Sequence, residues 1–108
     1  MMKLFLHGAD LVFSSKAKAM CDASGATMLS LRGAGPFPEA AHAPVVVDLV
    51  GRDALTAITA LTVAGATPLI AFGSHIHAAR LEEARAAGAD EAIPNSRFES
   101  RLRELLKE

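Results

Sequence analysis

The sequence contains no tryptophan and no tyrosine, and aromatic residues make up only 5% of its 108 residues. Such a composition offers no platform on which nucleic-acid bases could stack. Lysine and arginine (11) nearly balance aspartate and glutamate (12), so the formal net charge of −1 attracts neither nucleic acid nor an anionic membrane. Cys21 is the only cysteine, which excludes an internal disulfide and indicates a reducing compartment. We therefore expect a cytoplasmic protein that binds neither nucleic acid nor membranes.

Long hydrophobic runs are also missing. No uninterrupted apolar stretch approaches the roughly 20 residues that a membrane span needs, and the apolar stretch near the N-terminus is too short for a signal peptide. Hydrophobic residues nevertheless make up 51% of the chain, enough to build one core. The length and composition therefore predict a single domain over residues 1–108.

Five short apolar segments, which we interpret as strands, alternate with segments of helical periodicity. The strands are predicted at residues 4–6, 27–31, 45–47, 68–72 and 91–93. Such alternation indicates a parallel sheet with helices on both faces. The third and fourth strands are the most apolar, which places them inside the sheet and leaves the second and fifth at its edges. The predicted fold is an α/β, flavodoxin-like three-layer sandwich with strand order 2-1-3-4-5.

The second helix of this pattern is expected to be shortened, because residues 33–38 are rich in glycine and proline and break regular structure. Capping signals precede the other helices. Ser96 and Glu99 have the spacing of a capping box at the start of the last helix. The predicted N-caps of the three helices before it are Asp10, Asp53 and Ser74.

Two segments of the sequence resemble parts of the receiver domains of bacterial response regulators, the CheY-like family. The segment Val45–Leu49 (VVVDL) resembles the third strand of receivers, which ends on their phosphoacceptor aspartate. The segment Ala87–Ile93 (AGADEAI) resembles their passage from the fourth helix to the last strand. The spacing between the two segments also fits, and the resemblance covers essentially the whole chain. It implies a signalling domain in which Asp48 takes the phosphoacceptor position.

Other positions depart from the receiver pattern. Receivers hold Mg²⁺ with two acidic residues after the first strand, where this sequence has His7 and Gly8. The hydroxyl residue after their fourth strand and the lysine after their fifth are matched by Gly73 and Asn95. Phosphoryl transfer depends on stabilisation by the metal and the cation, so we expect Asp48 to be inactive and to bond backbone amides at the strand end. The sequence thus predicts a pseudo-receiver, a stand-alone protein-interaction module without catalytic residues, cofactor or output domain.

A second interpretation remains open for the polar residues that follow the strands. His7, Asp48, Ser74 and His75 are placed at the edge of the sheet where parallel α/β domains bind ligands. Together with His77, the histidines and Asp48 are a plausible ligand set for a transition metal, and the same edge suits a small ligand. The alternative is that polar residues gather at strand ends because water and backbone groups are accessible there.

The helix predicted over residues 54–64 carries no charged residue. Its outward positions are expected to be Thr56, Ala60 and Val63. A smooth face of small side chains permits close packing, which favours a protein partner or a second copy of the chain. The alternative is that small side chains expose little apolar area and need no partner.

Overall fold

The structure, a computed structural model, describes residues 2–107, so both terminal residues lie outside the described part. Five strands form one parallel sheet in the order β2-β1-β3-β4-β5. The predicted fold class and strand order are confirmed. The strands are β1 (Lys3–His7), β2 (Thr27–Leu31), β3 (Val45–Asp48), β4 (Leu69–Gly73) and β5 (Glu91–Pro94).

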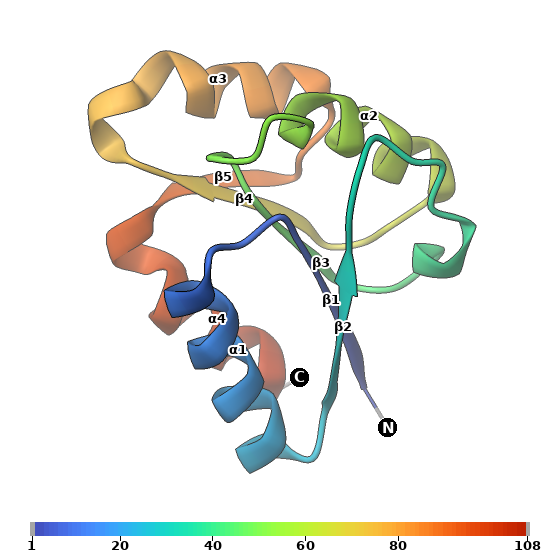
Figure 1. The fold of residues 1–108 in the computed structure, drawn as a ribbon, viewed down its shortest axis with the longest axis vertical. Coiled ribbons are helices and arrows are strands. Elements are labelled where there is room, and N and C mark those ends of the chain that lie inside the picture. The colour runs from blue at the N-terminus through green and yellow to red at the C-terminus, as the bar shows by residue number, and fades with distance from the viewer. Residues whose placement is uncertain (1, 108) are drawn as a thin grey trace.

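Helices cover both faces of this sheet (Figure 1). One face carries α1 (Leu11–Ser24) and α4 (Phe98–Lys107), and the other carries α2 (Ala54–Ala64) and α3 (Ala78–Ala87). As predicted, the second helix of the alternation is reduced, here to the 3₁₀ turn η1 (Pro38–Ala40). Two further 3₁₀ turns, η2 (His75–His77) and η3 (Asn95–Arg97), lead into α3 and α4. None of the helices within residues 2–107 has the length and apolar character to cross a membrane.

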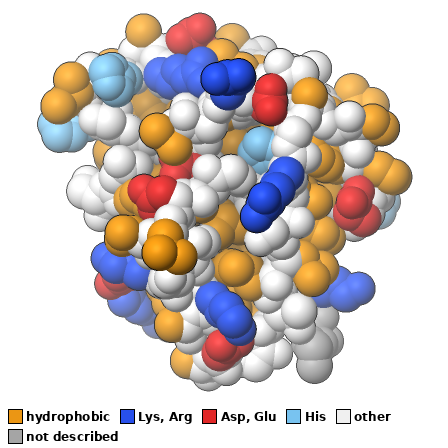
Figure 2. Space-filling model, viewed as in Figure 1, with side chains coloured by type: hydrophobic (Ala, Val, Ile, Leu, Met, Phe, Trp, Pro, Cys, Tyr) orange, Lys and Arg blue, Asp and Glu red, His pale blue; other side chains and the backbone are white. Residues whose placement is uncertain are grey.

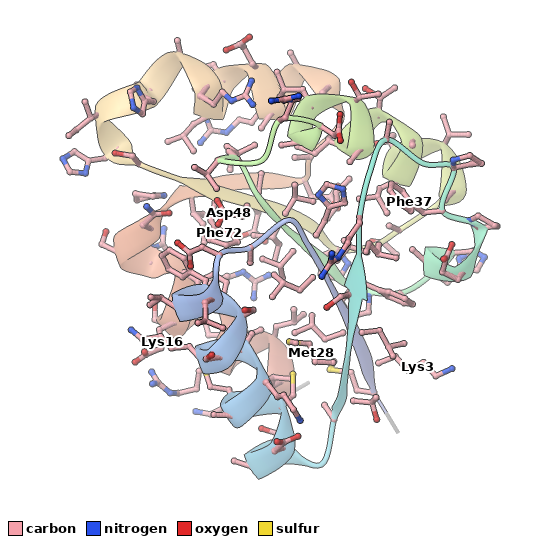
Figure 3. The ribbon with its side chains drawn as sticks, in the orientation of Figure 1. Lys3, Lys16, Met28, Phe37, Asp48 and Phe72 are labelled. Carbon is pink, nitrogen blue, oxygen red and sulfur yellow. The ribbon has the colours of Figure 1, made fainter. Side chains whose placement is uncertain are left out.

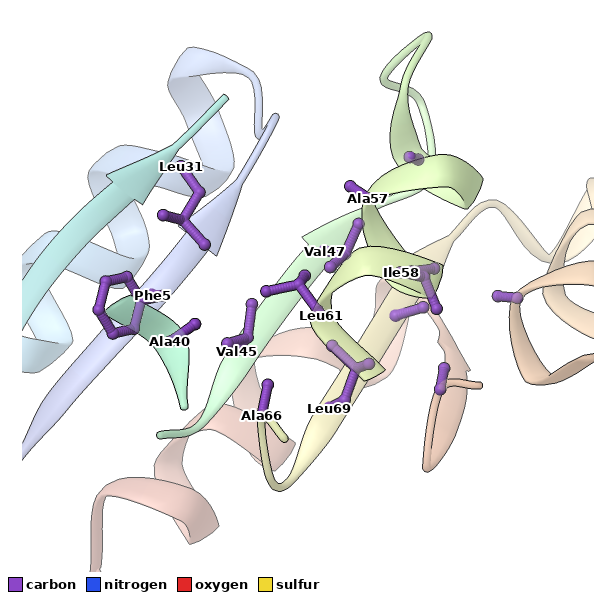
Figure 4. Close-up of a cluster of buried hydrophobic side chains, with 14 of the residues drawn as sticks. Phe5, Leu31, Ala40, Val45, Val47, Ala57, Ile58, Leu61, Ala66 and Leu69 are labelled. Atoms are coloured by element: carbon purple, nitrogen blue, oxygen red, sulfur yellow. The ribbon is translucent and has the colours of Figure 1, made fainter. Parts of the chain in front are cut away.

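The core is built around β3, whose four side chains are all buried. Val45 and Val47 pack toward α2, where they contact the cluster that includes Ile58 and Leu61 (Figure 4). Val46 faces the opposite side and joins the cluster formed with α1 and α4. Successive side chains of a strand point to opposite faces, so a continuous apolar run is what a strand covered on both faces requires.

Two predicted caps are confirmed. The Asp10 carboxylate accepts a hydrogen bond from the backbone N–H of Phe13 at 3.0 Å, and the Ser74 hydroxyl accepts one from Ile76 at 3.2 Å. Asp53 precedes α2 as predicted, but its side chain makes no capping hydrogen bond. Its ψ of 10° is not the extended conformation from which a side chain folds back over the first turn.

The predicted capping box of Ser96 and Glu99 is wrong. Ser96 lies inside η3, so it does not precede the helical turn as a cap must. Glu99 instead pairs with Arg103 at 3.3 Å on its own helix and with Lys16 of α1 at 3.4 Å. The carboxylate therefore links α4 to α1 rather than closing the start of α4.

The position of Gly88 at the end of α3 allows a test of the packing between α2 and α3. It ends α3 with φ of 124°, and a Cβ built on it would overlap Thr62 of α2, whose Cβ and Cγ2 would both be 3.0 Å away. Gly65 ends α2 with φ of 86° but has no heavy atom within 4 Å of such a Cβ. We expect Gly65→Ala to cost about 1 kcal/mol of unfolding free energy through backbone strain alone. Gly88→Ala should cost ~1–3 kcal/mol more, because it adds overpacking.

Urea unfolding of the two variants and the wild type measures the difference. Equal losses in the two alanine variants would contradict the close contact between Gly88 and Thr62.

Candidate functional site

A cleft of about 440 Å³ opens at the carboxyl edge of the sheet, where β3, β4 and β5 end. This is the edge at which open parallel sheets bind ligands. Two of the predicted site residues, Asp48 and Ser74, are brought together in its lining. Its other polar lining residues are His77, Arg80 and Asn95, and its apolar walls are formed by Leu49, Val50 and Leu81.

Asp48 ends β3 and is only 3% exposed. It lies beside Phe72, its register partner on β4 (Figure 3). Its Oδ1 accepts a hydrogen bond from the backbone N–H of Val50 at 3.0 Å, and the backbone N–H of Asp10 donates another to its carboxylate. Burial is the main cause that raises the pKa of Asp48; the two backbone hydrogen bonds oppose this rise, and the Asp10 carboxylate adds to it.

The charge of Asp48 has no cationic partner. Among the ion pairs formed within residues 2–107, none includes Asp48. The carboxylate therefore organises the loop after β3 through backbone amides, as the sequence predicts. Its negative charge stays uncompensated at the edge of the cleft.

Arg80 of α3 contributes to the cleft in a way that the sequence does not reveal. Its Nε and Nη2 atoms each donate to the carbonyl oxygen of Leu49 at 3.3 Å, and Nη2 also approaches that of Gly51 at 3.4 Å. These bonds attach α3 to the loop that follows Asp48. From the sequence alone, Arg80 is one charged residue among several on α3, since no local pattern indicates a contact 31 residues away.

Gly73 occupies the position at which receivers carry a hydroxyl residue. A Cβ built on it would lie 3.3 Å from both Cβ and Cδ1 of Leu49, which is tighter than ordinary van der Waals contact. The Leu49 side chain, 4% exposed, thus fills the space beside the end of β4. A larger residue at position 73 would require Leu49 to move.

His7 is buried away from the cleft, at 2% exposure. It pairs in register with Val47, and its ring packs edge-on against Phe37 at a centroid distance of 5.7 Å. Its Nε2 lies 2.7 Å from the carbonyl oxygen of Gly33. A carbonyl oxygen only accepts, so Nε2 carries the hydrogen. Within residues 2–107, the buried Nδ1 has no hydrogen-bond partner.

The structure does not bring the candidate metal ligands His7, Asp48, His75 and His77 together. His7 faces the α2 side of the sheet with Val47, whereas Asp48 is the next residue along β3 and points to the other face. His75 and His77 are exposed on η2. Over the described chain, no group of three or more His, Cys, Asp or Glu side chains is arranged to hold a metal ion. The small-ligand interpretation keeps only Asp48 and Ser74 of its four expected residues.

The predicted interface on α2 remains a prediction. Thr56 is exposed and Val63 is 84% exposed, but Ala60 is half-buried beneath the loop around Gly35. Beside them is an apolar hollow of about 270 Å³. Figure 2 shows charged side chains of both signs scattered over the displayed face rather than gathered into a patch. The hollow is lined by Pro36, Phe37, Pro38, Ala60, Val63 and Ala64.

Comparison with solved structures identifies the fold. The chain is similar to the receiver domain of a response regulator from Francisella, with a TM-score of 0.71 and 15% identity over 99% of this chain and 98% of that one. It is also similar to a response regulator in red light signaling of R. palustris, with a TM-score of 0.66 and 16% identity over 97% and 91% of the two chains. No protein-family model matches the sequence, and no curated protein matches it significantly. The expected likeness to receivers is confirmed for the fold.

The environment of Asp48 predicts a specific dependence of stability on pH. A carboxyl group whose pKa is raised on folding contributes stability that is present below its unfolded-state pKa and is lost as the pH rises through its folded-state pKa. The variant Asp48→Asn keeps an oxygen acceptor for Val50 and removes the buried charge. We expect it to be more stable than the wild type by on the order of 1 kcal/mol at neutral pH, and equally stable below about pH 4.

Urea unfolding at a series of pH values measures this difference. Asp22→Asn is the matched control, because Asp22 is exposed and pairs with Lys18 at 3.1 Å, so its loss should slightly destabilise the protein at neutral pH. An Asp48→Asn variant that is less stable than the wild type at neutral pH would contradict the account of a buried, uncompensated charge.

Proposed function

We propose that this chain is a pseudo-receiver, a signalling domain that acts by contacting other proteins and is not phosphorylated by the Mg²⁺-dependent route. The observation that carries this proposal is the end of β1. There, His7 is turned away from Asp48 and held by the Gly33 carbonyl, and Gly8 has no side chain. The acidic pair by which receivers hold Mg²⁺ thus has no counterpart at these two positions.

The local backbone supports the loss of a metal site. Mg²⁺ requires oxygen ligands in a near-octahedral arrangement. The backbone of Gly8 has φ of 70°, a left-handed conformation that residues other than glycine adopt only with strain. Asp10, the nearest acidic residue after β1, already uses its Oδ1 to cap α1. The capping role of Asp10 supports the proposal that Asp48 has no acidic pair beside it with which to hold Mg²⁺.

The other two parts of the receiver site are also replaced. Leu49 fills the space beside Gly73, so position 73 supplies no hydroxyl group to bond a phosphoryl oxygen, and the hydroxyl of the neighbouring Ser74 accepts the capping hydrogen bond from Ile76. Asn95, in the cleft at the start of η3, is uncharged where receivers have a lysine. Without the metal and this cation, the negative charge that develops during phosphoryl transfer is not stabilised. We infer that the domain has no enzymatic activity and that its signalling depends on binding in the cytoplasm.

The uncharged face of α2 is the surface that we assign to such binding, and a second copy of this chain is the partner that it fits. This face carries no charge, so a partner does not need opposite charges in order to bind it. It is therefore compatible with itself about a two-fold axis, the usual symmetry of soluble dimers. Val63, the most exposed apolar side chain of this face, would be covered in the dimer.

Phosphorylation is tested by incubating the protein with Mg²⁺ and acetyl phosphate and measuring its intact mass. We expect no phosphoryl adduct under conditions in which a receiver with the acidic pair, hydroxyl and lysine is fully modified. That receiver is the positive control. An adduct on this protein that disappears in Asp48→Asn would show that the missing groups are not required and would refute the pseudo-receiver proposal.

Self-association is tested by sedimentation equilibrium of the wild type and Val63→Glu. We expect the wild type to dimerise and the variant to dimerise at least about tenfold more weakly, because a buried unpaired carboxylate is costly. Leu11→Glu is the control, since Leu11 is 80% exposed on α1, away from α2. A wild type that stays monomeric at every concentration, or equal effects of the two glutamates, would exclude α2 as the interface.

A further inference from the structure

A second cavity, of about 320 Å³, opens where β1 and β2 end beside the first turns of α1. We call it the β1–β2 cavity. It shares no lining residue with the carboxyl-edge cleft. Gly8 and Ala9 border it with little or no side chain, and its polar side chains are those of Ser14, Ser30 and Arg32. Polar groups from α1 and from the end of β2 thus surround one hollow.

The alternation of β2 directs Ser30 and Arg32 toward α1. Met28 packs against the cluster on the α1 side of the sheet and lies between β2 and α1 (Figure 3), whereas Leu31 belongs to the cluster on the opposite side. Ser30 is the register partner of Leu6, which is also on the α1 side. Because successive side chains of a strand point to opposite faces, Ser30 projects toward α1, and Arg32 follows it on the same side.

Ser14 reaches the β1–β2 cavity from the helix. Ala17 and Cys21 follow it by three and seven residues, and both are fully buried against the sheet. Residues at this spacing share one face of a helix, so Ser14 continues the sheet-facing stripe of α1 toward its N-terminus. Its hydroxyl group donates to the carbonyl oxygen of Asp10 at 2.8 Å. A hydroxyl oxygen has two lone pairs, so Ser14 can still accept a hydrogen bond from a ligand.

The positive charge at the β1–β2 cavity is not neutralised by the protein. Within residues 2–107, Arg32 forms no ion pair, and neither Arg32 nor Ser30 uses its side chain in a hydrogen bond. Asp10 follows Ala9, but its carboxylate turns back to accept from Phe13 and does not line the cavity. The cavity thus presents a guanidinium group and a hydroxyl group that are both free to donate.

These donors suit a tetrahedral oxyanion. The planar guanidinium fork donates two parallel hydrogen bonds to a phosphate group, and such charge-assisted bonds are the stronger kind. A third oxygen, which a carboxylate lacks, is left for the hydroxyl of Ser30. The cavity volume of about 320 Å³ exceeds that of a phosphate ion and lies at the lower end of the range for small-molecule sites. No aromatic ring lines it, so it offers no surface on which a nucleobase could stack.

We propose that the β1–β2 cavity binds a phosphate group, either as free phosphate or as the monoester of a short hydroxylated carbon chain. Arg32 donates to two oxygens of the phosphate and Ser30 donates to the third. In an ester, the oxygen of Ser14 accepts a hydrogen bond from a hydroxyl group of the carbon chain. This site goes beyond the pseudo-receiver function, because it requires neither Asp48 nor a protein partner and forms no covalent bond.

The experiment compares four small molecules. Glycerol 3-phosphate, inorganic phosphate, glycerate and glycerol are each titrated into the isotope-labelled protein at low ionic strength. The dissociation constant is read from the chemical shifts of the backbone amides of Gly8, Ala9, Ser30 and Arg32. We expect glycerol 3-phosphate or phosphate to bind with a dissociation constant on the order of 1 mM or below, and glycerate to bind at least about tenfold more weakly. Glycerol, which has no charge, should not bind.

The two phosphate compounds distinguish the source of the phosphate group. Tighter binding of glycerol 3-phosphate identifies the site as one for an ester, in which Ser14 contacts the carbon chain. Equal binding of the two compounds identifies it as a site for free phosphate.

Substitutions test the two donors. Arg32→Gln should weaken phosphate binding at least about tenfold, and Ser30→Ala should weaken it about three- to tenfold. Arg32 and Ser30 are both exposed, so neither change removes a core contact. Arg52→Gln is the matched control for the charge, because Arg52 is exposed outside the cavity and forms no ion pair within residues 2–107. Ser15→Ala is the control for the hydroxyl group, since Ser15 is exposed on α1 and does not line the cavity.

Three results would overturn the phosphate site: no shift of the cavity amides by either phosphate compound in the millimolar range, binding of glycerate as tight as that of glycerol 3-phosphate, or equal effects of Arg32→Gln and Arg52→Gln. These results are separate from the test of the pseudo-receiver proposal. That proposal fails on a covalent phosphoryl adduct that depends on Asp48, whereas binding in the β1–β2 cavity leaves the mass of the protein unchanged.

Discussion

The burial of β3 on both faces is the constraint on which the geometry of the carboxyl edge depends. Three consecutive valines hold the strand between β1 and β4, and they contribute to both core clusters. A shift of one residue would exchange the faces of all three, so the register is strongly fixed. Asp48 follows these valines, and its position at the edge is therefore set by apolar packing rather than by its own interactions.

The same alternation separates residues that are close in the sheet. His7 and Asp48 end neighbouring strands, yet the register places His7 opposite Val47 and so directs the two side chains to different faces. His7 is used to hold the loop at Gly33, which takes the place of a helix on that side. The loop in turn lies over α2, where Gly35 has no room for a side chain beside Ala60, at 2.7 Å. His7 thus helps to hold in place the loop that stands where a full helix would otherwise lie.

The parts of the structure that could be predicted are those that depend on local sequence patterns. The apolar runs predict the positions of all five strands. Gly65 marks the end of α2, so the predicted bounds of this helix agree with the observed ones. The failure of the predicted caps at Asp53 and Ser96 could not be foreseen, because a side chain caps a helix only if its own residue precedes the helix in an extended conformation. The loop sets the conformation of Asp53, and Ser96 already lies inside η3. Arg80 was missed for a different reason: its contact with Leu49 joins two elements whose relative placement no sequence pattern encodes.

The packing of Leu49 against Gly73 limits the movements that are open to the end of β4. A switch needs two arrangements of similar free energy, between which a modification or ligand chooses. At the end of β4 there is no side chain to swing, and the neighbouring space is already filled. Under the proposed function, a signal would therefore be encoded in the abundance of the domain or in the occupancy of its surfaces, and not in the movement of a side chain at position 73.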